Sequence, residues 1–272
     1  MLQLKVDRLK KILSDGGPSI VAFSGGVDSS LLLQVTTEVL GNRVVALTAA
    51  SPSMPGKAMA QAVSFAQRFS IEHLIVSSNE LDDPNYIRNP DNRCFYCKDE
   101  LYRICENVRR KRGLNFIYDG TIMNDLSEHR PGLQAQEKYA IRSPLVEAGF
   151  TKIDVRELSQ KLNIQGWDRP ASPCLSSRFP VGISISPERL KRVEEFEEFL
   201  HSLGFLECRV RFYESMAKIE VDKELVSKAT ASPLHELILN RGKSLGFKQV
   251  VIDIDGYQRG KLTNHLVNIE EM

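Results

Sequence analysis

Residues 20–33 read Ile-Val-Ala-Phe-Ser-Gly-Gly-Val-Asp-Ser-Ser-Leu-Leu-Leu, and they decide the fold of this 272-residue chain. The first four residues are apolar and predict a buried strand, whereas residues 29–40 predict a helix that ends at Gly41. The glycines between them lack a Cβ atom, so the backbone of this turn can approach an anion closely. The unpaired amides and the positive dipole end of the following helix attract such an anion. The stretch therefore predicts a phosphate-binding loop between a strand and a helix.

The side chains of this loop suit an anion bound together with a metal. Ser24, Ser29 and Ser30 supply hydroxyl donors, and Asp28 supplies a carboxylate that can hold a divalent cation beside the anion. Two other phosphate loops are excluded, because the stretch lacks the Gly-Lys-Ser/Thr ending of a Walker loop and the Gly-x-Gly-x-x-Gly of a dinucleotide fold. The alternative is a glycine-containing turn in an ordinary α/β domain.

The string Ser-Gly-Gly-x-Asp-Ser at residues 24–29 resembles the PP-loop of the N-type ATP pyrophosphatases. That resemblance implies an enzyme that holds the β- and γ-phosphates of ATP, cleaves between the α- and β-phosphates, and activates a carbonyl or carboxyl group by adenylation. Asp28 would then act in catalysis by helping to position Mg²⁺. The residues that would bind the nucleotide in this loop are Ser24, Gly25, Gly26, Val27, Asp28, Ser29 and Ser30.

The alternation of apolar strands with helical periods predicts an α/β fold with a doubly wound parallel sheet. Strands are expected at residues 20–23, 44–48, 73–76 and 116–119, with helices at residues 29–40, 55–69 and 98–112 between them. The loops beyond the carboxyl ends of such strands form the ligand crevice. Thr48, Gly120 and Asp125 lie at or after strand ends and are further candidates for nucleotide binding.

The chain changes character after residues 166–170. Residues 186–203 and 234–244 predict helices, residues 208–212 and 218–221 predict a strand pair, and residues 249–254 predict a last strand. We therefore expect a PP-loop domain at residues 1–168 and a small α+β domain at residues 169–272 that includes a cysteine loop.

Charge and hydropathy limit the partners of the chain. Lys and Arg number 36 against 35 Asp and Glu, a net charge of +1 that argues against binding long duplex nucleic acid. No apolar run approaches the roughly 20 residues needed to span a bilayer. We expect a cytoplasmic homo-oligomer that binds neither nucleic acid nor membrane.

Five cysteines in a chain without a recognisable secretory signal favour thiol chemistry or metal binding over disulfides. Cys94 and Cys97 form a Cys-x-x-Cys at the expected start of a helix, where thiolates are stabilised. Cys174 lies in a proline-bounded loop near Arg169 and Arg178, whose cations would stabilise a reactive thiolate. The alternative for Cys174 is a buried, inert thiol.

Several further motifs together resemble the LarE family of ATP-dependent sulfur transferases, which build the nickel-pincer nucleotide of lactate racemase. They are Ser-Pro-Leu at residues 143–145, Glu-Ala-Gly at 147–149, Thr-Lys at 151–152, Trp-Asp-Arg-Pro at 167–170 and Cys-Leu-Ser-Ser-Arg at 174–178. The resemblance implies that ATP adenylates a carboxylate of a pyridinium dicarboxylate mononucleotide, and that Cys174 attacks the acyl-adenylate while Arg178 contributes to binding. In the sacrificial version the Cβ–S bond breaks, which leaves a thiocarboxylate on the substrate and dehydroalanine on the protein.

The chain is also similar to a three-cysteine branch of that family, in which Cys94, Cys97 and Cys174 would hold a 4Fe-4S cluster. Three thiolates leave one iron open, and that iron could carry an exogenous sulfide, so that Cys174 would survive each turnover. Zinc is the structural alternative, although closed zinc sites favour four protein ligands and the nearest fourth candidate, Cys105, is expected to be buried.

One string departs from the family pattern. Related PP-loop proteins carry Gly-Thr-Asn-x-Asp-Asp, whereas residues 120–125 read Gly-Thr-Ile-Met-Asn-Asp, and of these Asp125 is expected to keep its role. Arg209, Arg211 and Glu220 resemble family positions that line a substrate or ion site, although charged residues on an exposed strand are more often solvated.

Two other functions fit the same loop. The first is a tRNA-thiolating or amide-forming PP-loop ligase, against which the near-zero net charge speaks because a tRNA enzyme normally needs a basic surface or an added RNA-binding domain. The second is a regulatory module whose cysteines hold a structural or sensing metal, and it would bind ATP without turnover.

Overall fold

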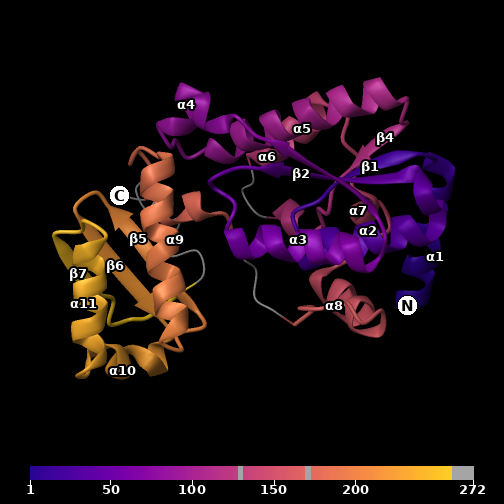
Figure 1. Cartoon of the computed structure of the whole chain (residues 1–272). Helices are drawn as coiled ribbons and strands as arrows, with labels where there is room; N and C mark the ends of the chain where they lie inside the picture. Colours follow the sequence, from indigo (N-terminus) through magenta and orange to yellow (C-terminus); the bar gives the residue numbers. More distant parts are fainter. Residues whose placement is uncertain (128–130, 169–172, 259–272) are drawn as a thin grey trace, which may run out of the picture. The chain divides into compact units, whose positions relative to one another are not determined.

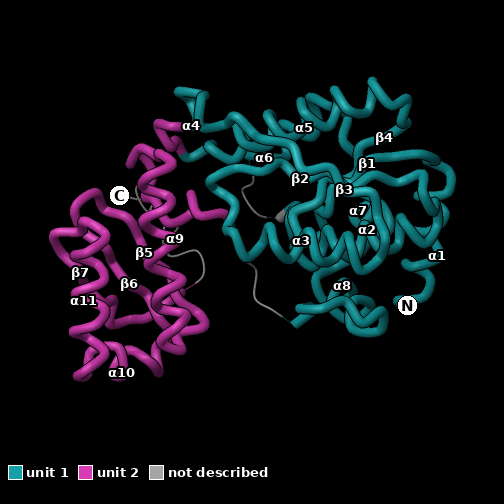
Figure 2. The backbone as a smooth tube through the Cα atoms, viewed as in Figure 1, with its two compact units in different colours: residues 1–86, 91–173 teal, residues 87–90, 174–272 magenta. Residues whose placement is uncertain are grey.

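The computed structural model describes residues 1–127, 131–168 and 173–258. The chain divides into two compact units, shown in different colours in Figure 2: unit 1 holds residues 1–86 and 91–173, and unit 2 holds residues 87–90 and 174–272. The expected boundary between residues 168 and 169 adjoins residues 169–172, which lie outside the described residues. Arg169 of the cysteine loop is one of these residues.

Unit 1 is built on a parallel sheet of four strands in the order β3-β2-β1-β4 (Figure 1). Its strands are β1 (Ser19–Ala22), β2 (Val44–Ala50), β3 (Glu72–Ser77) and β4 (Phe116–Tyr118). The chain lays down β1, β2 and β3 in one direction and then returns to the other side of β1 for β4. The order therefore reverses between β1 and β4, which is where open α/β sheets bind ligands beyond the carboxyl ends of their strands.

Helices cover both faces of this sheet, so the predicted α/β fold with a doubly wound parallel sheet is confirmed. The helices are α1 (Leu2–Gly16), α2 (Val27–Leu40), α3 (Gly56–Arg68), α4 (Pro84–Ile87), α5 (Arg93–Arg112), α6 (Gly132–Lys138), α7 (Pro144–Glu147) and α8 (Lys152–Lys161). Val21 faces a core that includes apolar residues of α1, α2, α3 and α8, whereas Ile20 faces a second core with α5 and α6. Because both faces are buried, β1 is apolar throughout its last three residues and shows no alternation.

Two elements differ from the prediction in useful ways. Helix α5 begins at Arg93, five residues before the expected start at residue 98, so Cys94 and Cys97 both lie inside its first turns. The segment between β3 and α5, for which no helix was predicted, contains the short helix α4. Among the described residues, no helix combines the length and apolar character that a bilayer crossing requires.

Unit 2 is the small α+β unit that the sequence predicts. It contains α9 (Pro187–Ser202), β5 (Cys208–Tyr213), β6 (Met216–Val221), α10 (Val226–Thr230), α11 (Leu234–Ser244) and β7 (Gln249–Ile252). Strand β6 pairs antiparallel with β5 and parallel with β7. Alternate residues of β5, such as Val210 and Phe212, are buried because that face of the sheet turns toward the core.

A buried carboxylate joins four segments at the carboxyl end of β4. Asp119 is only 2% exposed. It accepts hydrogen bonds from the Tyr102 hydroxyl at 2.8 Å, the Ser143 hydroxyl at 2.8 Å, the Thr121 hydroxyl at 2.9 Å and the Gln136 amide. These partners belong to α5, the segment before α7, the loop after β4, and α6. Asp119 thus ties the helix that carries Cys94 and Cys97 to the sheet edge beside the predicted phosphate loop.

We expect Asp119→Ala to lower the free energy of unfolding by about 3 kcal/mol or more, because it leaves several buried donors without an acceptor. Asp15→Ala is the control, since the Asp15 carboxylate forms only an exposed pair with Lys11 and its loss should cost less than about 0.5 kcal/mol. Urea unfolding followed by circular dichroism measures both. Equal costs for the two variants would contradict the role assigned to Asp119.

Candidate functional site

The predicted phosphate loop has the backbone geometry that its glycines suggested. Gly25 has φ +75°, a left-handed conformation that favours glycine, and a Cβ there would lie 3.0 Å from the carbonyl oxygen of Ala58. Gly26 follows as the N-cap of α2 in an extended conformation. The Ser29 hydroxyl donates to the Gly26 carbonyl at 3.0 Å and lies 3.2 Å from the Ser24 hydroxyl. The loop is therefore a closed, hydrogen-bonded turn at a helix N-terminus.

The residues of this loop differ in their exposure. Ser24 and Gly26 are exposed, and Val27 and Asp28 are half-buried in the loop and first turn of α2. Ser29 and Ser30 are buried, with side chains directed at the protein rather than at solvent. An anion at this turn would therefore meet the backbone, the Ser24 hydroxyl and the Asp28 carboxylate first.

A lysine that is distant from the loop in sequence contacts Asp28. Lys152 Nζ lies 2.8 Å from both carboxylate oxygens of Asp28, although the two residues are 124 positions apart. The backbone of Lys152 is held in place because Thr151 caps α8 in a capping box with Asp154, and because the Lys152 amide donates to Asn124 Oδ1 at 2.8 Å. In the sequence, Lys152 stands out only as part of the Thr-Lys motif at residues 151–152, and no neighbouring residue predicts its contact with the phosphate loop.

Gly120 brings the end of β4 against the start of α2. A Cβ at Gly120 would lie 2.8 Å from the Ser29 backbone nitrogen and 3.0 Å from Ser29 Cα. Neither atom can move without shifting the first turn of α2. Gly120, which the sequence predicted to bind the nucleotide, therefore lies beside the loop. The packing there leaves no room for a side chain.

The other two crevice candidates are engaged within the protein. The Thr48 hydroxyl donates to the Phe23 carbonyl at 2.7 Å and lies 2.7 Å from His73 Nε2, and Thr48 is 1% exposed. Burial lowers the pKa of His73, which favours the neutral imidazole in this pair. Asp125 accepts a hydrogen bond from the Ile122 amide at 3.0 Å. These contacts shape the loops around the phosphate turn.

A second buried carboxylate, which the sequence did not reveal, fixes the loops after β2 and β3. Glu80 is 2% exposed, and the hydroxyls of Ser51, Ser53 and Ser78 donate to its carboxylate. Ser51 and Ser53 belong to the loop after β2, and Ser78 follows β3. The crevice edge of the sheet is therefore held by Glu80 on one side and by Asp119 on the other.

The five cysteines fall into two groups. Cys94 is exposed, and Cys97 and Cys174 are half-buried, whereas Cys105 and Cys208 are buried as expected for inert thiols. Burial raises the pKa of both Cys105 and Cys208 to about 12, so neither is a thiolate at neutral pH. Cys94 and Cys97 lie in unit 1 and Cys174 in unit 2. In the described part of the chain, no three His, Cys, Asp or Glu side chains gather as a metal site.

A cation follows the Cys-x-x-Cys directly. Burial would lower the pKa of Lys98, but attraction to Tyr102 and Asp119 outweighs it, so the pKa of Lys98 lies above its ordinary value. Lys98 also interacts electrostatically with Cys97.

The turn after Cys174 is fixed by a buried ion pair within unit 2. Arg178 is 2% exposed and forms two hydrogen bonds with Glu197, at 2.9 and 2.8 Å. Its Nη1 also donates to the Cys174 carbonyl at 3.1 Å and to the Ser177 hydroxyl at 3.0 Å. The guanidinium expected to contact a ligand therefore holds the Cys174 carbonyl and the Ser177 hydroxyl of this turn. Glu197 lies in the acidic stretch at residues 194–198 of α9 and is buried, although acidic side chains are usually solvated.

Two charged residues of β5 and β6, Arg211 and Glu220, are buried rather than solvated, whereas Arg209 is half-buried. Arg211 is 5% exposed and Glu220 is fully buried, and the Arg211 guanidinium donates to Glu220 at 2.8 Å. Arg211 also donates to the Ser177 carbonyl at 3.0 Å, whereas Arg209 stacks on Tyr257. The same turn is thus held by a second arginine.

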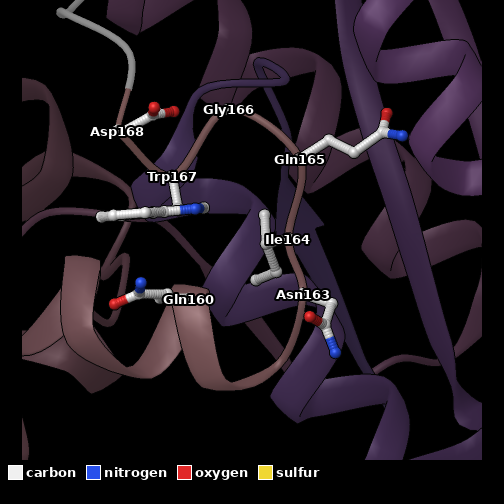
Figure 3. Close-up of a pocket in the computed structure, with 7 residues that line it drawn as sticks. All are labelled: Gln160, Asn163, Ile164, Gln165, Gly166, Trp167 and Asp168. Atoms are coloured by element: carbon white, nitrogen blue, oxygen red, sulfur yellow. The ribbon is translucent and has the colours of Figure 1, made fainter.

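A pocket of about 600 Å³ lies in unit 1 where α8 ends (Figure 3). Trp167 and Ile164 point toward its middle, and Gln160 faces them from α8. Asp168 at its rim directly precedes residues 169–172, which lie outside the described residues, and we assign the pocket no ligand.

The chain is similar to several known proteins, although no protein-family model matches it. It is 40% identical over 266 residues to an uncharacterized protein of Synechocystis, covering 98% of this chain and 99% of that protein. It is 32% identical over 239 residues to an uncharacterized protein of Methanocaldococcus jannaschii, covering 88% and 90%. It is also 32% identical over 270 residues to the pyridinium-3,5-bisthiocarboxylic acid mononucleotide synthase of Lactiplantibacillus plantarum, covering 99% of this chain and 97% of that protein. The chain belongs to the LarE family.

The structure explains where this LarE chain departs from the expected string at residues 120–125. Ile122 is 3% exposed and packs in the core of unit 1, so an apolar residue suits its position. Asn124 accepts a hydrogen bond from the backbone of Lys152 at 2.8 Å, a task for which an amide oxygen serves as well as a carboxylate. Core packing therefore explains the isoleucine at position 122, and the hydrogen bond to the start of α8 explains the asparagine at position 124.

We expect Gly120→Ala in this LarE chain to weaken ATP binding about tenfold or more, because the methyl group displaces the first turn of α2. Gly132→Ala is the matched control, since its Cβ would lie 3.1 Å from Lys98 Cγ, a side-chain atom, and 3.7 Å from the Cys94 carbonyl oxygen, an ordinary contact distance that leaves the backbone in place. Calorimetric titration with ATP and Mg²⁺ measures both affinities. Unchanged binding in Gly120→Ala would show that the close approach to Ser29 is not needed.

Proposed function

We propose that this LarE-family enzyme is an ATP-dependent sulfur transferase acting on a pyridinium dicarboxylate mononucleotide. It would adenylate one carboxylate of that substrate with release of pyrophosphate and then convert it to a thiocarboxylate. The observation that carries the proposal is the similarity, over 99% of the chain, to a protein named pyridinium-3,5-bisthiocarboxylic acid mononucleotide synthase. The closed loop at the switch point of the sheet supports the nucleotide part of the reaction.

The loop residues fit a magnesium-bound triphosphate. The backbone from Gly25 to Asp28 leads into the N-terminus of α2, and the Ser24 hydroxyl is exposed beside it. The Lys152 ammonium lies 2.8 Å from each carboxylate oxygen of Asp28, which supports a cation position at this carboxylate. Mg²⁺ and ATP bound here would supply charge neutralisation and the adenylyl group. The fixed amides of the loop would stabilise the negative charge that develops on the departing pyrophosphate.

Cys174 is proposed as the residue that delivers sulfur. Its thiolate would attack the activated carbonyl carbon, AMP would leave, and a thioester to Cys174 Sγ would form. In the sacrificial route, removal of the Cys174 Cα proton then breaks the Cβ–S bond, so that sulfur and its electron pair leave on the substrate as a thiocarboxylate and dehydroalanine remains. Attack requires a defined geometry, and Arg178 supplies it by binding the Cys174 carbonyl.

The alternative source of sulfur is a 4Fe-4S cluster held by Cys94, Cys97 and Cys174. The donor set fits such a group, because these three thiols are the accessible ones and the other two are buried. A cluster with one open iron would supply a site for exogenous sulfide and spare Cys174. Cys97 lies beside the Lys98 cation, which would offset part of the negative charge of thiolate ligands.

We expect Cys174→Ala to form pyrophosphate and the acyl-adenylate from ATP and the pyridinium substrate but no thiocarboxylate, because adenylation uses the loop, whereas release of AMP and sulfur transfer use the thiol. Cys208→Ala is the control, as it removes a buried thiol of the same unit. Mass spectrometry of the product and a pyrophosphate assay separate the two steps. Thiocarboxylate formation by Cys174→Ala would remove the thiol from the reaction.

Iron and acid-labile sulfide analysis of the anaerobically reconstituted protein distinguishes the two sources of sulfur. The cluster predicts about four irons per chain and broad visible absorption, both lost in Cys94→Ala and retained in Cys105→Ala. A colourless, iron-free protein that still makes one thiocarboxylate per chain would favour the sacrificial route. Loss of 34 Da from the intact protein, as expected for conversion of cysteine to dehydroalanine, would then be found after turnover.

A further inference from the structure

The ion pair between Lys152 and Asp28 occupies the carboxylate that the reaction needs. Lys152 Nζ lies 2.8 Å from each oxygen of Asp28, so the two acceptor atoms directed at the cation position are both in use. The two side chains are 30% and 29% exposed, and a pair this accessible to water is weak. A divalent cation placed on the same carboxylate would therefore displace the ammonium.

We propose that Lys152 exchanges partners when magnesium-bound ATP enters the loop, leaving Asp28 to the metal and binding a phosphate oxygen of the nucleotide. The inference rests on the proposed function, since it assigns a second cation to the same adenylation site. Lys152 would then be a catalytic residue that contacts the triphosphate directly.

The anchoring of Lys152 suits such an exchange. Its backbone is fixed at the start of α8 by the Thr151 cap and by Asn124, so the root of the side chain stays beside the loop. Among the described residues, the Lys152 ammonium is hydrogen-bonded to Asp28, and an ammonium on a four-carbon stem can reach a nearby second acceptor without backbone movement. The arrangement keeps a cation in place before the nucleotide arrives.

Charge supplies the driving force. A triphosphate carries more negative charge than one Mg²⁺ neutralises, and the charge on the β-phosphate rises as the bond to the α-phosphate breaks. In the absence of metal, Asp28 and Lys152 neutralise each other, so that neither offers its full charge to the nucleotide. Binding of Mg²⁺ to Asp28 would release Lys152 for the phosphates and would make metal and nucleotide binding cooperative.

Helix α8 also offers a matched control. Lys5 Nζ forms a 2.6 Å ion pair with Asp154 in the first turn of α8, and the two side chains are 25% and 17% exposed. This pair resembles that of Lys152 in length and exposure, but its carboxylate caps α8 and does not belong to the loop. Lys5→Met therefore removes an ammonium from the same helix start without touching the proposed phosphate contact.

The test is calorimetric titration with the non-cleavable α,β-methylene analogue of ATP, with Mg²⁺ and with EDTA. We expect Lys152→Met to bind the magnesium complex about 10- to 100-fold more weakly than the wild type, the loss expected for a charge-assisted hydrogen bond. Lys152→Gln should lose as much affinity, because its amide carries no charge, although the amide can still form a hydrogen bond with Asp28. Lys152→Arg should restore part of the affinity, and Lys5→Met should bind as the wild type does.

A double-variant cycle tests the exchange itself. Asp28→Asn should bind the metal-free analogue several-fold more tightly than the wild type, because Lys152 is freed and a negative charge is removed. The effect of the negative charge alone is measured by adding Asp28→Asn to Lys152→Gln. If Lys152 makes the new contact, Asp28→Asn raises the affinity less in the Lys152→Gln background than in the wild-type background. Wild-type affinity for the magnesium complex in Lys152→Met and Lys152→Gln, or an equal gain in the two backgrounds, would overturn the proposal.

The same measurements separate this inference from the proposed function. A wild-type protein that binds the analogue as described but releases no pyrophosphate with the pyridinium substrate would refute the function and leave the role of Lys152 intact. A wild-type protein that turns over, with unaltered binding in the Lys152 variants, would refute the role of Lys152 alone.

Discussion

The site in unit 1 depends on the close approach of two backbone segments at the switch point of the sheet. Strands β1 and β4 are hydrogen-bonded neighbours, so their carboxyl ends emerge side by side. Gly120 after β4 then meets the backbone of Ser29 at the start of α2, with no room for a side chain between them. Because the amides of that first turn are the groups proposed to bind the anion, the packing of β4 fixes the direction in which these amides point. Asp119, one residue earlier, ties the same edge to α5 and its two cysteines.

Polar contacts over long sequence separations complete the site. Lys152 reaches Asp28 because α8 begins where Asn124 and the Thr151 cap place it. Glu80 draws together the loops after β2 and β3 in the same manner. In each case a buried or half-buried charge has its partners within hydrogen-bonding distance, which is the condition under which a charge can remain in a protein interior. The chemistry of the loop is therefore set by residues that come from the whole of unit 1.

The sequence predicted those parts of the structure that arise from local pattern. The strand, loop and helix at residues 20–40 are local because hydrophobic period and glycine conformation act over a few residues, and the capping box at Thr151 is equally local. The partners of Asp119, Glu80 and Glu197 were missed because a carboxylate that is buried against distant donors looks, in sequence, like one that is solvated. Lys152 was visible as part of a motif, but its target lies 124 residues away and becomes apparent only in the folded chain.

The buried ion pair of unit 2 has a consequence for sulfur transfer. A buried pair such as Arg178 and Glu197 is weak evidence for stability, since desolvation offsets much of the attraction, but it fixes geometry. Here it binds the carbonyl of Cys174 and leaves the side chain of Cys174 half-buried rather than enclosed. A backbone held in this way suits a cysteine that attacks once and gives up its sulfur. It suits equally a cysteine that remains a metal ligand. The turn at Cys174 is therefore compatible with both routes, and what distinguishes them is whether Cys94 and Cys97, in the first turns of α5, bind iron.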